Sequence, residues 1–517
     1  MWNLWWVYYA LVEGKGSPLD CDLLFFPWGC DLRFHTLSIM NGWLALPLTA
    51  LMGSVVAYNA LFVLWTFATQ FFAAIWAKEQ GAGRYASILL GLVAAVGAYR
   101  WNHLEHLNLF STGWLFLAFW QCDRLWQRPD HRRAMLFTLA WMGTALTDWY
   151  YALFVGVYWG GRLLMQTIEP DVRPLQKGLP YFIFPPLALT ALVMIYFSPG
   201  DKIYPANDPQ QFSIVVTSFW SLDGLHLITP PWLIEALSLP VQQGSEFRLH
   251  PGLLLLLLGV WGVASKGVLR LQRYLVGVMA VFFVLSLGPL LRLGGEPVSL
   301  GSVPFFLPAA LHAYLPGFDS MRVFTRFSYI GFVILALFGL ARLEQWLRGY
   351  GRSFYQALLW LIVVLGFLLE SQWRPLPLSH YQAPKKIATW QEGGLAEFPF
   401  EPTVMSGLHL FHQTLHQQPI YVAEFSRMGQ YKEKYLQSFP ILKRLNDWAL
   451  GRAVERNSNI ECNLLKSIKL DGVIFYQFPE KPDPADRLNE QCEEVEIDSI
   501  ELGLLQNTQS QASVSNK

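Results

Sequence analysis

Four ionisable residues stand between two apolar runs in the stretch "RWNHLEHLN", residues 100–108. His103 and His106 are three residues apart with Glu105 between them, so the two imidazoles share a face if the stretch is helical. Such a pair could bind a divalent metal or a phosphate, or supply a general base. The alternative is a pair of interfacial histidines satisfied by backbone groups and water. Ionisable groups near a membrane are candidates for function by default.

Carboxylates that could act as a base or hold a metal occur at two further places. The stretch "LDCDLLFFPWGCD" contains Asp20, Asp22 and Asp31, of which the first two form a D-x-D pair. A D-x-D pair can hold a metal-bound phosphate or provide a base, but this spacing is also common by chance. Asp148 in "TDWYY" precedes an apolar run, where a carboxylate either caps a helix or takes part in chemistry.

An arginine pair could hold a phosphate. In "LPGFDSMRVFTRFS", Arg322 and Arg326 are four residues apart at the start of an apolar run, on one face of an expected helix. The guanidinium fork suits phosphate oxygens. The competing interpretation is that both side chains extend to lipid headgroups. We favour the phosphate of a lipid-linked substrate.

The composition indicates that membrane helices must position these residues. Of 517 residues, 53% are hydrophobic and 15% are charged, whereas soluble proteins carry about 25% charged residues. The formal net charge is zero, which gives no reason to expect nucleic acid as a partner. About ten apolar windows are candidate spans, and they lie near residues 54–77, 85–99, 108–122, 134–147, 150–168, 179–197, 252–265, 274–291, 325–343 and 355–370.

The distribution of Lys and Arg predicts an orientation. One alternating set of short loops holds 15 of these residues, whereas the longer loops of the other set hold seven. The positive-inside rule therefore places the first set in the cytoplasm and the second set outside. On this topology the segments around His103, Asp148 and Arg326, the first loop and everything after Leu369 share the external face.

Four regions follow from these patterns. Residues 1–53 are predicted to be an interfacial aromatic segment, "MWNLWWVYYALV", and a first external loop, because the segment is too short to span a bilayer and lacks a cleavage site. Residues 54–370 form a multi-pass transmembrane domain. Residues 371–505 alternate strand-like and helix-like runs and predict a small external α/β domain, and residues 506–517 predict a disordered tail.

Four cysteines fall on the predicted external side. Two disulfides, Cys21–Cys30 and Cys462–Cys492, would suit an oxidising compartment. The alternative is four free, buried thiols.

The order of the motifs resembles that of membrane glycosyltransferases of the C-type superfamily (GT-C) and the related YfhO-like proteins of bacteria. The resemblance rests on "DLLFFPWGCDLRFHTLSIMNGW", "YRWNHLEHLNLFSTGW", "TDWYYALF", "EFRLHPGLLLLLLGVWG", "LPGFDSMRVFTRFS" and "HLFHQTLHQQPIYVAEFSR". It implies a mostly α, polytopic membrane fold with the active site on the external face. Such enzymes move a sugar from a polyprenyl-phosphate carrier to an acceptor outside the cytoplasmic membrane.

The resemblance also implies roles for the candidate residues. A first-loop acid, here Asp20, Asp22 or Asp31, would act as base or metal ligand. Glu105 and Asp148 are further catalytic candidates, and His103 and His106 would line the cavity or hold a metal. The carrier phosphate would be held by Arg322, Arg326 and Arg100.

One departure from the resembling proteins concerns the start of the chain. Their key acid usually follows the first membrane helix, ahead of the segment that looks like "WNLWWVYYAL". This chain begins at that segment, so we expect either an upstream start or an inactive copy.

The sequence thus predicts a glycosyltransferase of the bacterial cytoplasmic membrane whose C-terminal domain lies outside. Its partners would be membrane lipid, a polyprenyl-phosphate-linked sugar and an acceptor that is a glycan, a lipid or a protein. The sequence leaves open whether the reaction uses a divalent metal as cofactor. The alternative is a non-enzymatic carrier or assembly factor for lipid-linked glycans, which would need no carboxylate base.

Overall fold

The structure is a computed structural model of the whole chain. It describes residues 1–14, 16–33, 35–168, 173–198, 221–269, 272–288, 291–300, 303–304, 323–349, 353–371, 383–391, 393–400, 403–423, 429–450, 452, 471–477 and 496–501.

The described chain is mostly helical, and each of the ten apolar windows overlaps a helix. These helices are α2 (Ile39–Glu79), α3 (Arg84–Val96), α6 (Gly113–Gln127), α7 (His131–Thr147), α8 (Trp149–Ile168), α9 (Arg173–Tyr196), α12 (Leu253–Ala264), α13 (Gln272–Ser286), α15 (Phe327–Arg348) and α16 (Ser353–Glu370). Within the described residues, three stretches are long and apolar enough to cross a membrane, judged by length and composition: Ile39–Glu79, Gly178–Tyr196 and Phe327–Arg348. Three further apolar helices are shorter, with 10–17 residues: Leu253–Ala264, Arg273–Ser286 and Phe354–Glu370.

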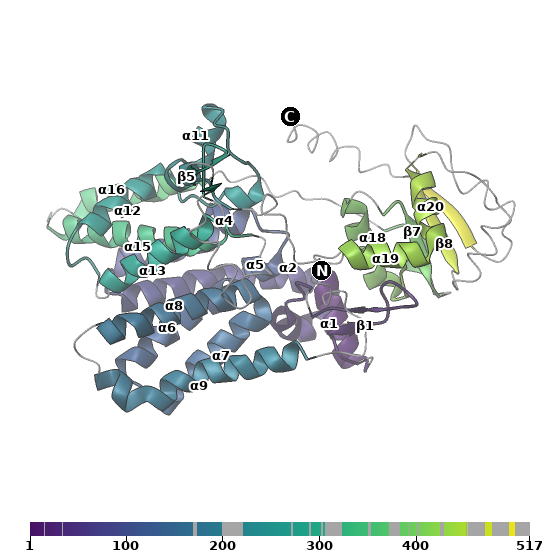
Figure 1. Cartoon of the computed structure of the whole chain (residues 1–517), viewed down its shortest axis with the longest axis horizontal. Coiled ribbons are helices and arrows are strands. Elements are labelled where there is room, and N and C mark those ends of the chain that lie inside the picture. Colours follow the sequence, from purple (N-terminus) through teal and green to yellow (C-terminus); the bar gives the residue numbers. More distant parts are fainter. Residues whose placement is uncertain are drawn as a thin grey trace.

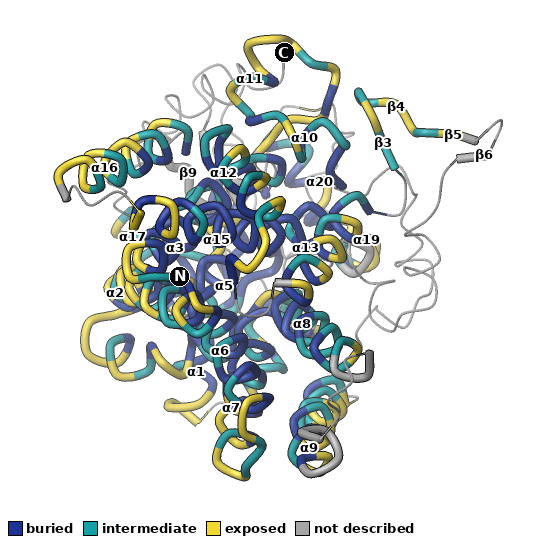
Figure 2. The backbone as a smooth tube through the Cα atoms, turned by 90° about the vertical axis from the view of Figure 1, so that its left-hand side faces the viewer, coloured by how far each residue is buried: buried dark blue, intermediate teal, exposed yellow. Residues whose placement is uncertain are grey.

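Helix α15 is the centre of the bundle, whereas α2 lies at its surface. In their most apolar windows, 94% of α15 is buried against 28% of α2, and Figure 2 shows α15 among the darkest segments. Helix α12 crosses α15 closely at Gly262. A Cβ at this residue would lie 2.3 Å from the carbonyl oxygen of Phe338, so only glycine fits there. Small residues allow this approach of two backbones.

Helix α2 is two helices joined at a break. Gly53 has φ 81° and ψ 167°, a backbone conformation outside the helical region, and this region is accessible essentially to glycine alone. The second half begins at residue 54, where the predicted span begins. The first half, residues 39–52, is helical although the sequence predicted a loop there.

The C-terminal domain is built on a parallel sheet. Strands β7 (Leu395–Phe398), β8 (Gly472–Gln477) and β9 (Glu496–Glu501) pair in the order β7-β8-β9. They lie within the predicted α/β region, residues 371–505, and α17 (Lys385–Ala388), α18 (Thr403–His416), α19 (Gly429–Ser438) and α20 (Pro440–Ala449) belong to the same domain. In Figure 1 this domain lies to one side of the bundle, with helix α1 between the two.

The N-terminal segment packs into this domain. Leu24 forms a parallel bridge to Ile420, which bridges in turn to Leu395 of β7. The Ile420 N–H donates to the Leu23 carbonyl at 2.8 Å, and the Phe26 N–H donates to the Ile420 carbonyl at 3.3 Å. The first loop therefore extends the sheet beyond β7, across the boundary that the sequence drew between residues 1–53 and 371–505.

Helix α1 (Trp2–Val12) is also part of the protein core. Its buried side chains include Trp2, Trp5 and Trp6, and the Trp2 indole donates to Gln413 of α18 at 2.8 Å. The sequence predicted that these aromatic residues lie in the membrane interface. They instead pack against protein, because α2 and the C-terminal domain cover the faces of α1 that were expected to contact lipid.

Candidate functional site

The stretch from Arg100 to Asn108 forms a turn between two short helices. Helix α4 (Ala98–Trp101) and helix α5 (Leu107–Phe110) flank it, so His103 and His106 are not on one helical face as predicted. The turn still brings them together, with ring centroids 6.3 Å apart. His103 is buried and His106 is accessible.

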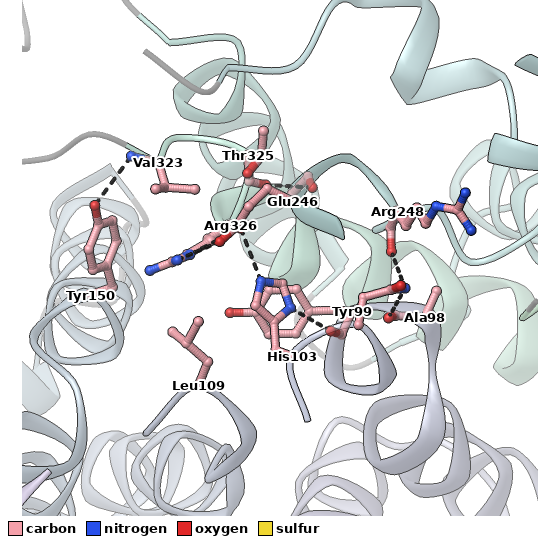
Figure 3. Close-up of polar contacts among 12 residues, drawn as sticks. Ala98, Tyr99, His103, Leu109, Tyr150, Glu246, Arg248, Val323, Thr325 and Arg326 are labelled. Atoms are coloured by element: carbon pink, nitrogen blue, oxygen red, sulfur yellow. Dashed lines mark hydrogen bonds and ion pairs between the residues drawn. The ribbon is translucent and has the colours of Figure 1, made fainter. Parts of the chain in front are cut away.

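The centre of the candidate site is Glu246, which lies between His103 and Arg326 (Figure 3). Its carboxylate accepts hydrogen bonds from Arg326 Nη2 at 2.6 Å and Nε at 3.3 Å, and lies 3.0 Å from His103 Nε2. The opposite ring nitrogen of His103 donates to the Tyr99 carbonyl at 2.6 Å. Three segments far apart in sequence therefore meet: the α4–α5 turn, the short helix η4 (Ser245–Phe247) and the residue before α15.

The cluster lowers the pKa of Glu246. Burial alone would raise this pKa, but the hydrogen bond from His103 and the positive charge of Arg326 outweigh burial. Glu246 is thus a carboxylate at neutral pH. It is a counter-ion for Arg326 and has no proton to donate.

Aromatic side chains line the walls of this cluster. The Arg326 guanidinium lies 5.1 Å from the centroid of the Tyr150 ring, and the Tyr150 hydroxyl accepts the Val323 N–H at 3.3 Å. The Tyr99 and Tyr151 hydroxyls are 2.9 Å apart. These contacts leave Arg326 little freedom to move away from the turn that carries His103.

Asp148 lies at the junction of α7 and α8 and is buried. One carboxylate oxygen accepts the Tyr150 N–H at 2.8 Å, which is the capping role expected at a helix start. The other accepts from the Asn108 amide at 2.6 Å, which ties Asp148 to the α4–α5 region. Burial raises the pKa of Asp148, and the charge of Arg326 opposes this rise.

An open pocket of about 100 Å³ adjoins Asn108. Glu105 and His106 line it, together with Tyr58, Leu107 and Asn108 and, from the N-terminal part of the chain, Met1, Asn3, Leu4, Thr36, Leu37, Ser38 and Asn41. Although part of the His106 side chain is accessible, the protein around its ring together with His103 and Arg326 lowers its pKa to about 4, so its ring is neutral at pH 7. A neutral imidazole in a pocket can accept a proton or a hydrogen bond from a bound molecule.

The other arginine candidates are placed differently. Arg100 is fully buried, donates to the Phe110 carbonyl at 2.8 Å and lies over the Phe110 ring at 3.6 Å. Its position is that of a structural side chain that closes the α4–α5 turn. Arg322 lies outside the described residues, and so do Cys462 and Cys492.

The first-loop aspartates are in a separate hairpin, β1 (Asp20–Cys21) and β2 (Cys30–Asp31). Asp20 and Asp31 are opposite each other, and both pair with Arg33, at 3.2 and 2.6 Å. Asp22 is exposed. Within the described chain, neither Asp20 nor Asp31 contacts the Glu246 cluster.

The two cysteines of the same hairpin also face each other. Cys21 and Cys30 are cross-strand neighbours, and both are buried free thiols in the structure. They form no disulfide in the structure, which for this pair matches the alternative of free, buried thiols.

Metal binding finds no support in the described part of the chain, because no three His, Cys, Asp or Glu side chains lie close enough to hold an ion. His103, His106 and Glu105 therefore do not assemble with a further acid into a metal site among these residues.

Sequence reasoning did not single out Glu246, Asn108 or Tyr150. Glu246 occurs in the motif "EFRLHPG", directly before an apolar run, and a lone acid at that position is a signal that could have been followed. Asn108 and Tyr150 carry no such signal, because their importance comes from contacts with Asp148 and Arg326.

No family model matches this chain, and no curated protein matches it. Solved structures similar to it include the archaeal oligosaccharyltransferase AglB from Archaeoglobus fulgidus in complex with an inhibitory peptide and a dolichol-phosphate (10% identity, TM-score 0.40, covering 82% of this chain and 60% of that one). They also include an oligosaccharyltransferase from A. fulgidus in the apo form (10% identity, TM-score 0.40, covering 84% and 64%). This chain thus spans less than two thirds of the length of either.

Proposed function

We propose that the chain is a membrane glycosyltransferase that moves a sugar from a polyprenyl-phosphate carrier to an acceptor at the external membrane face. The observation that carries the proposal is the joint position of Arg326, His103 and Asp148. A fixed cation and a buried carboxylate of raised pKa meet at one end of an apolar helical bundle, next to an open pocket. Such a pair can supply both a general base for the acceptor and a cation for the carrier phosphate.

Each residue has a defined part in the reaction. Asp148 would accept the proton of the acceptor hydroxyl, since a carboxylate of raised pKa is a stronger base than an ordinary one. Arg326 would stabilise the charge that develops on the departing carrier phosphate. In the resting structure Glu246 occupies the fork of Arg326, and the carrier phosphate would take its place.

Among the predicted acids, Asp148 is therefore the base that we favour. Asp20 and Asp31 already share Arg33, and their carboxylates stabilise the β1–β2 hairpin. Glu105 lines the pocket and would bind the acceptor.

The test is the Asp148→Asn variant, assayed in proteoliposomes with a polyprenyl-phosphate-linked sugar. We expect the transfer rate to fall about a hundredfold or more, which is the scale of general-base catalysis, with retention of the lipid-linked donor unchanged. In the wild type, activity should fall on the acidic side at a higher pH than an ordinary aspartate would give, because the base works only above its raised pKa.

The matched control is Glu296→Gln, which removes an exposed carboxylate of the hairpin β3 (Arg292–Leu293) and β4 (Glu296–Pro297). This variant should keep full activity. Unchanged transfer by Asp148→Asn would contradict the proposal, and the non-enzymatic role of a lipid-linked glycan carrier or assembly factor would replace it.

A further inference from the structure

A second polar pocket lies at the opposite end of the bundle from Asp148. Helix α2 begins beside the candidate site and ends at this pocket, which opens among the ends of α2 and α6 and the first turn of α7. Its volume is about 540 Å³. Three cationic side chains, Lys78, Arg124 and Arg133, line it with a single carboxylate, Glu79.

The cations of this pocket are largely available for a ligand. Glu79 accepts a hydrogen bond from the Gln127 amide at 2.6 Å and is not paired with a cation among the described residues. Arg133 pairs with Asp130 at 3.1 Å. The Arg124 guanidinium lies 5.3 Å from the Trp120 ring centroid, and no described residue forms a hydrogen bond or ion pair with its side chain or with that of Lys78.

Apolar surfaces lead directly into the pocket. On α2, Phe67, Phe71 and Ile75 recur every four residues along one face, and Ile75 is part of the pocket wall. Phe67 and Phe71 are 67% and 58% exposed. On α7, Leu136 is 38% exposed and stands one turn from Arg133. The pocket thus combines basic side chains with apolar side chains that are exposed along α2 and α7.

We propose that this pocket binds the phosphate headgroup of an anionic phospholipid, with the acyl chains lying along the exposed faces of α2 and α7. Basic pockets between membrane helices on the positively charged side recognise such headgroups. The pocket also holds Trp120, a side chain that favours headgroup depth. The site is separate from the proposed transferase site and does not depend on it.

The test is native mass spectrometry of the full chain in detergent, titrated with phosphatidylglycerol or with phosphatidylcholine of the same acyl chains. We expect preferential retention of phosphatidylglycerol. Lys78→Gln and Arg124→Gln should each weaken this retention about fivefold, the effect of one cation near an anionic headgroup. Arg124→Lys keeps the charge and should retain the lipid.

The matched control is Arg132→Gln. Arg132 is exposed, adjacent to Arg133 and absent from the pocket lining, so its removal should leave the preference unchanged. Equal loss in this variant would show attraction by overall charge and overturn the proposal. Displacement of the lipid by millimolar glycerol phosphate would overturn it in favour of a soluble phosphate. Equal retention of both lipids would leave the basic residues as counter-charges for the C-terminal ends of α2 and α6.

Discussion

At the residue scale, Glu246 joins His103 and Arg326, which come from different parts of the chain. Its side chain and that of Arg326 are each 12% exposed, so the charge of Arg326 has little water to stabilise it. Glu246→Gln should lower the free energy of unfolding by about 3 kcal/mol, because removal of one partner leaves a buried charge uncompensated. Thermal unfolding of the detergent-solubilised protein measures this change.

A second acid–arginine pair provides the control. Glu235 pairs with Arg248, but the Glu235 side chain is 44% exposed. Exposed ion pairs contribute roughly 1 kcal/mol or less, so Glu235→Gln should change the unfolding temperature much less than Glu246→Gln. Equal effects of the two substitutions would contradict the central position that we give Glu246.

Some of these residues could be predicted from sequence, for a physical reason. His103, Asp148 and Arg326 stood out because charge near an apolar run is costly and needs a cause. Arg100 stood out for the same reason, but its guanidinium donates to the carbonyls of Phe110 and Ala95 and packs on the Phe110 ring, while its Nη2 has no hydrogen-bond partner among the described residues. Composition cannot distinguish an arginine that closes a turn from one that faces a ligand, because the difference depends on tertiary contacts.

At the element scale, the break in α2 should depend on Gly53. Gly53→Ala should lower the free energy of unfolding by about 2 kcal/mol, since the observed φ and ψ are strained for any residue with a Cβ. A Cβ there meets nothing within 4 Å, so steric clash is not the cause. Chemical unfolding or thermal unfolding reports the loss.

Gly277 in α13 is the matched glycine. Its backbone is helical, and a Cβ there would also meet nothing within 4 Å. Gly277→Ala should therefore stabilise the protein slightly, by up to about 1 kcal/mol. Stabilisation by both substitutions would show that α2 becomes straight when Gly53 is replaced.

The helices within the ten apolar windows were predictable because they depend on local periodicity, whereas the helical residues 39–52 before Gly53 were missed. Strands β7, β8 and β9 lie within the predicted α/β region. The pairing of Leu24 with Ile420 was not predictable, because nothing local distinguishes a loop from a segment that bridges to a distant sheet.

At the scale of the whole molecule, pH should control the stability of the C-terminal domain. Burial lowers the pKa of His409 and of His416 to about 4, whereas an unfolded histidine has a pKa near 6.5. The unfolded state therefore binds more protons between these values, and the domain should lose stability as the pH falls from about 6.5 to 4. Hydrogen exchange of β7 and β8, corrected for the intrinsic rate at each pH, measures this loss.

Replacement of both histidines by asparagine should flatten this pH dependence, whereas His131→Asn, on the exposed start of α7, should not. Glu397 contributes in a different range. Its pKa is lowered to about 2, because its interactions with His412 and His409 outweigh burial, so its contribution is lost only below about pH 4.5. An unchanged exchange rate between pH 7 and pH 5 would contradict the prediction.

The bridge between Leu24 and Ile420 also constrains the topology by parity. Two residues that pair in one sheet lie on the same side of a bilayer, so the chain between them crosses an even number of times. The three long apolar helices alone would give an odd number and would separate the paired strands. If all three cross, an odd number of further crossings must lie between Leu24 and Ile420. The ten predicted spans, an even number that all lie between these two residues, satisfy the same condition.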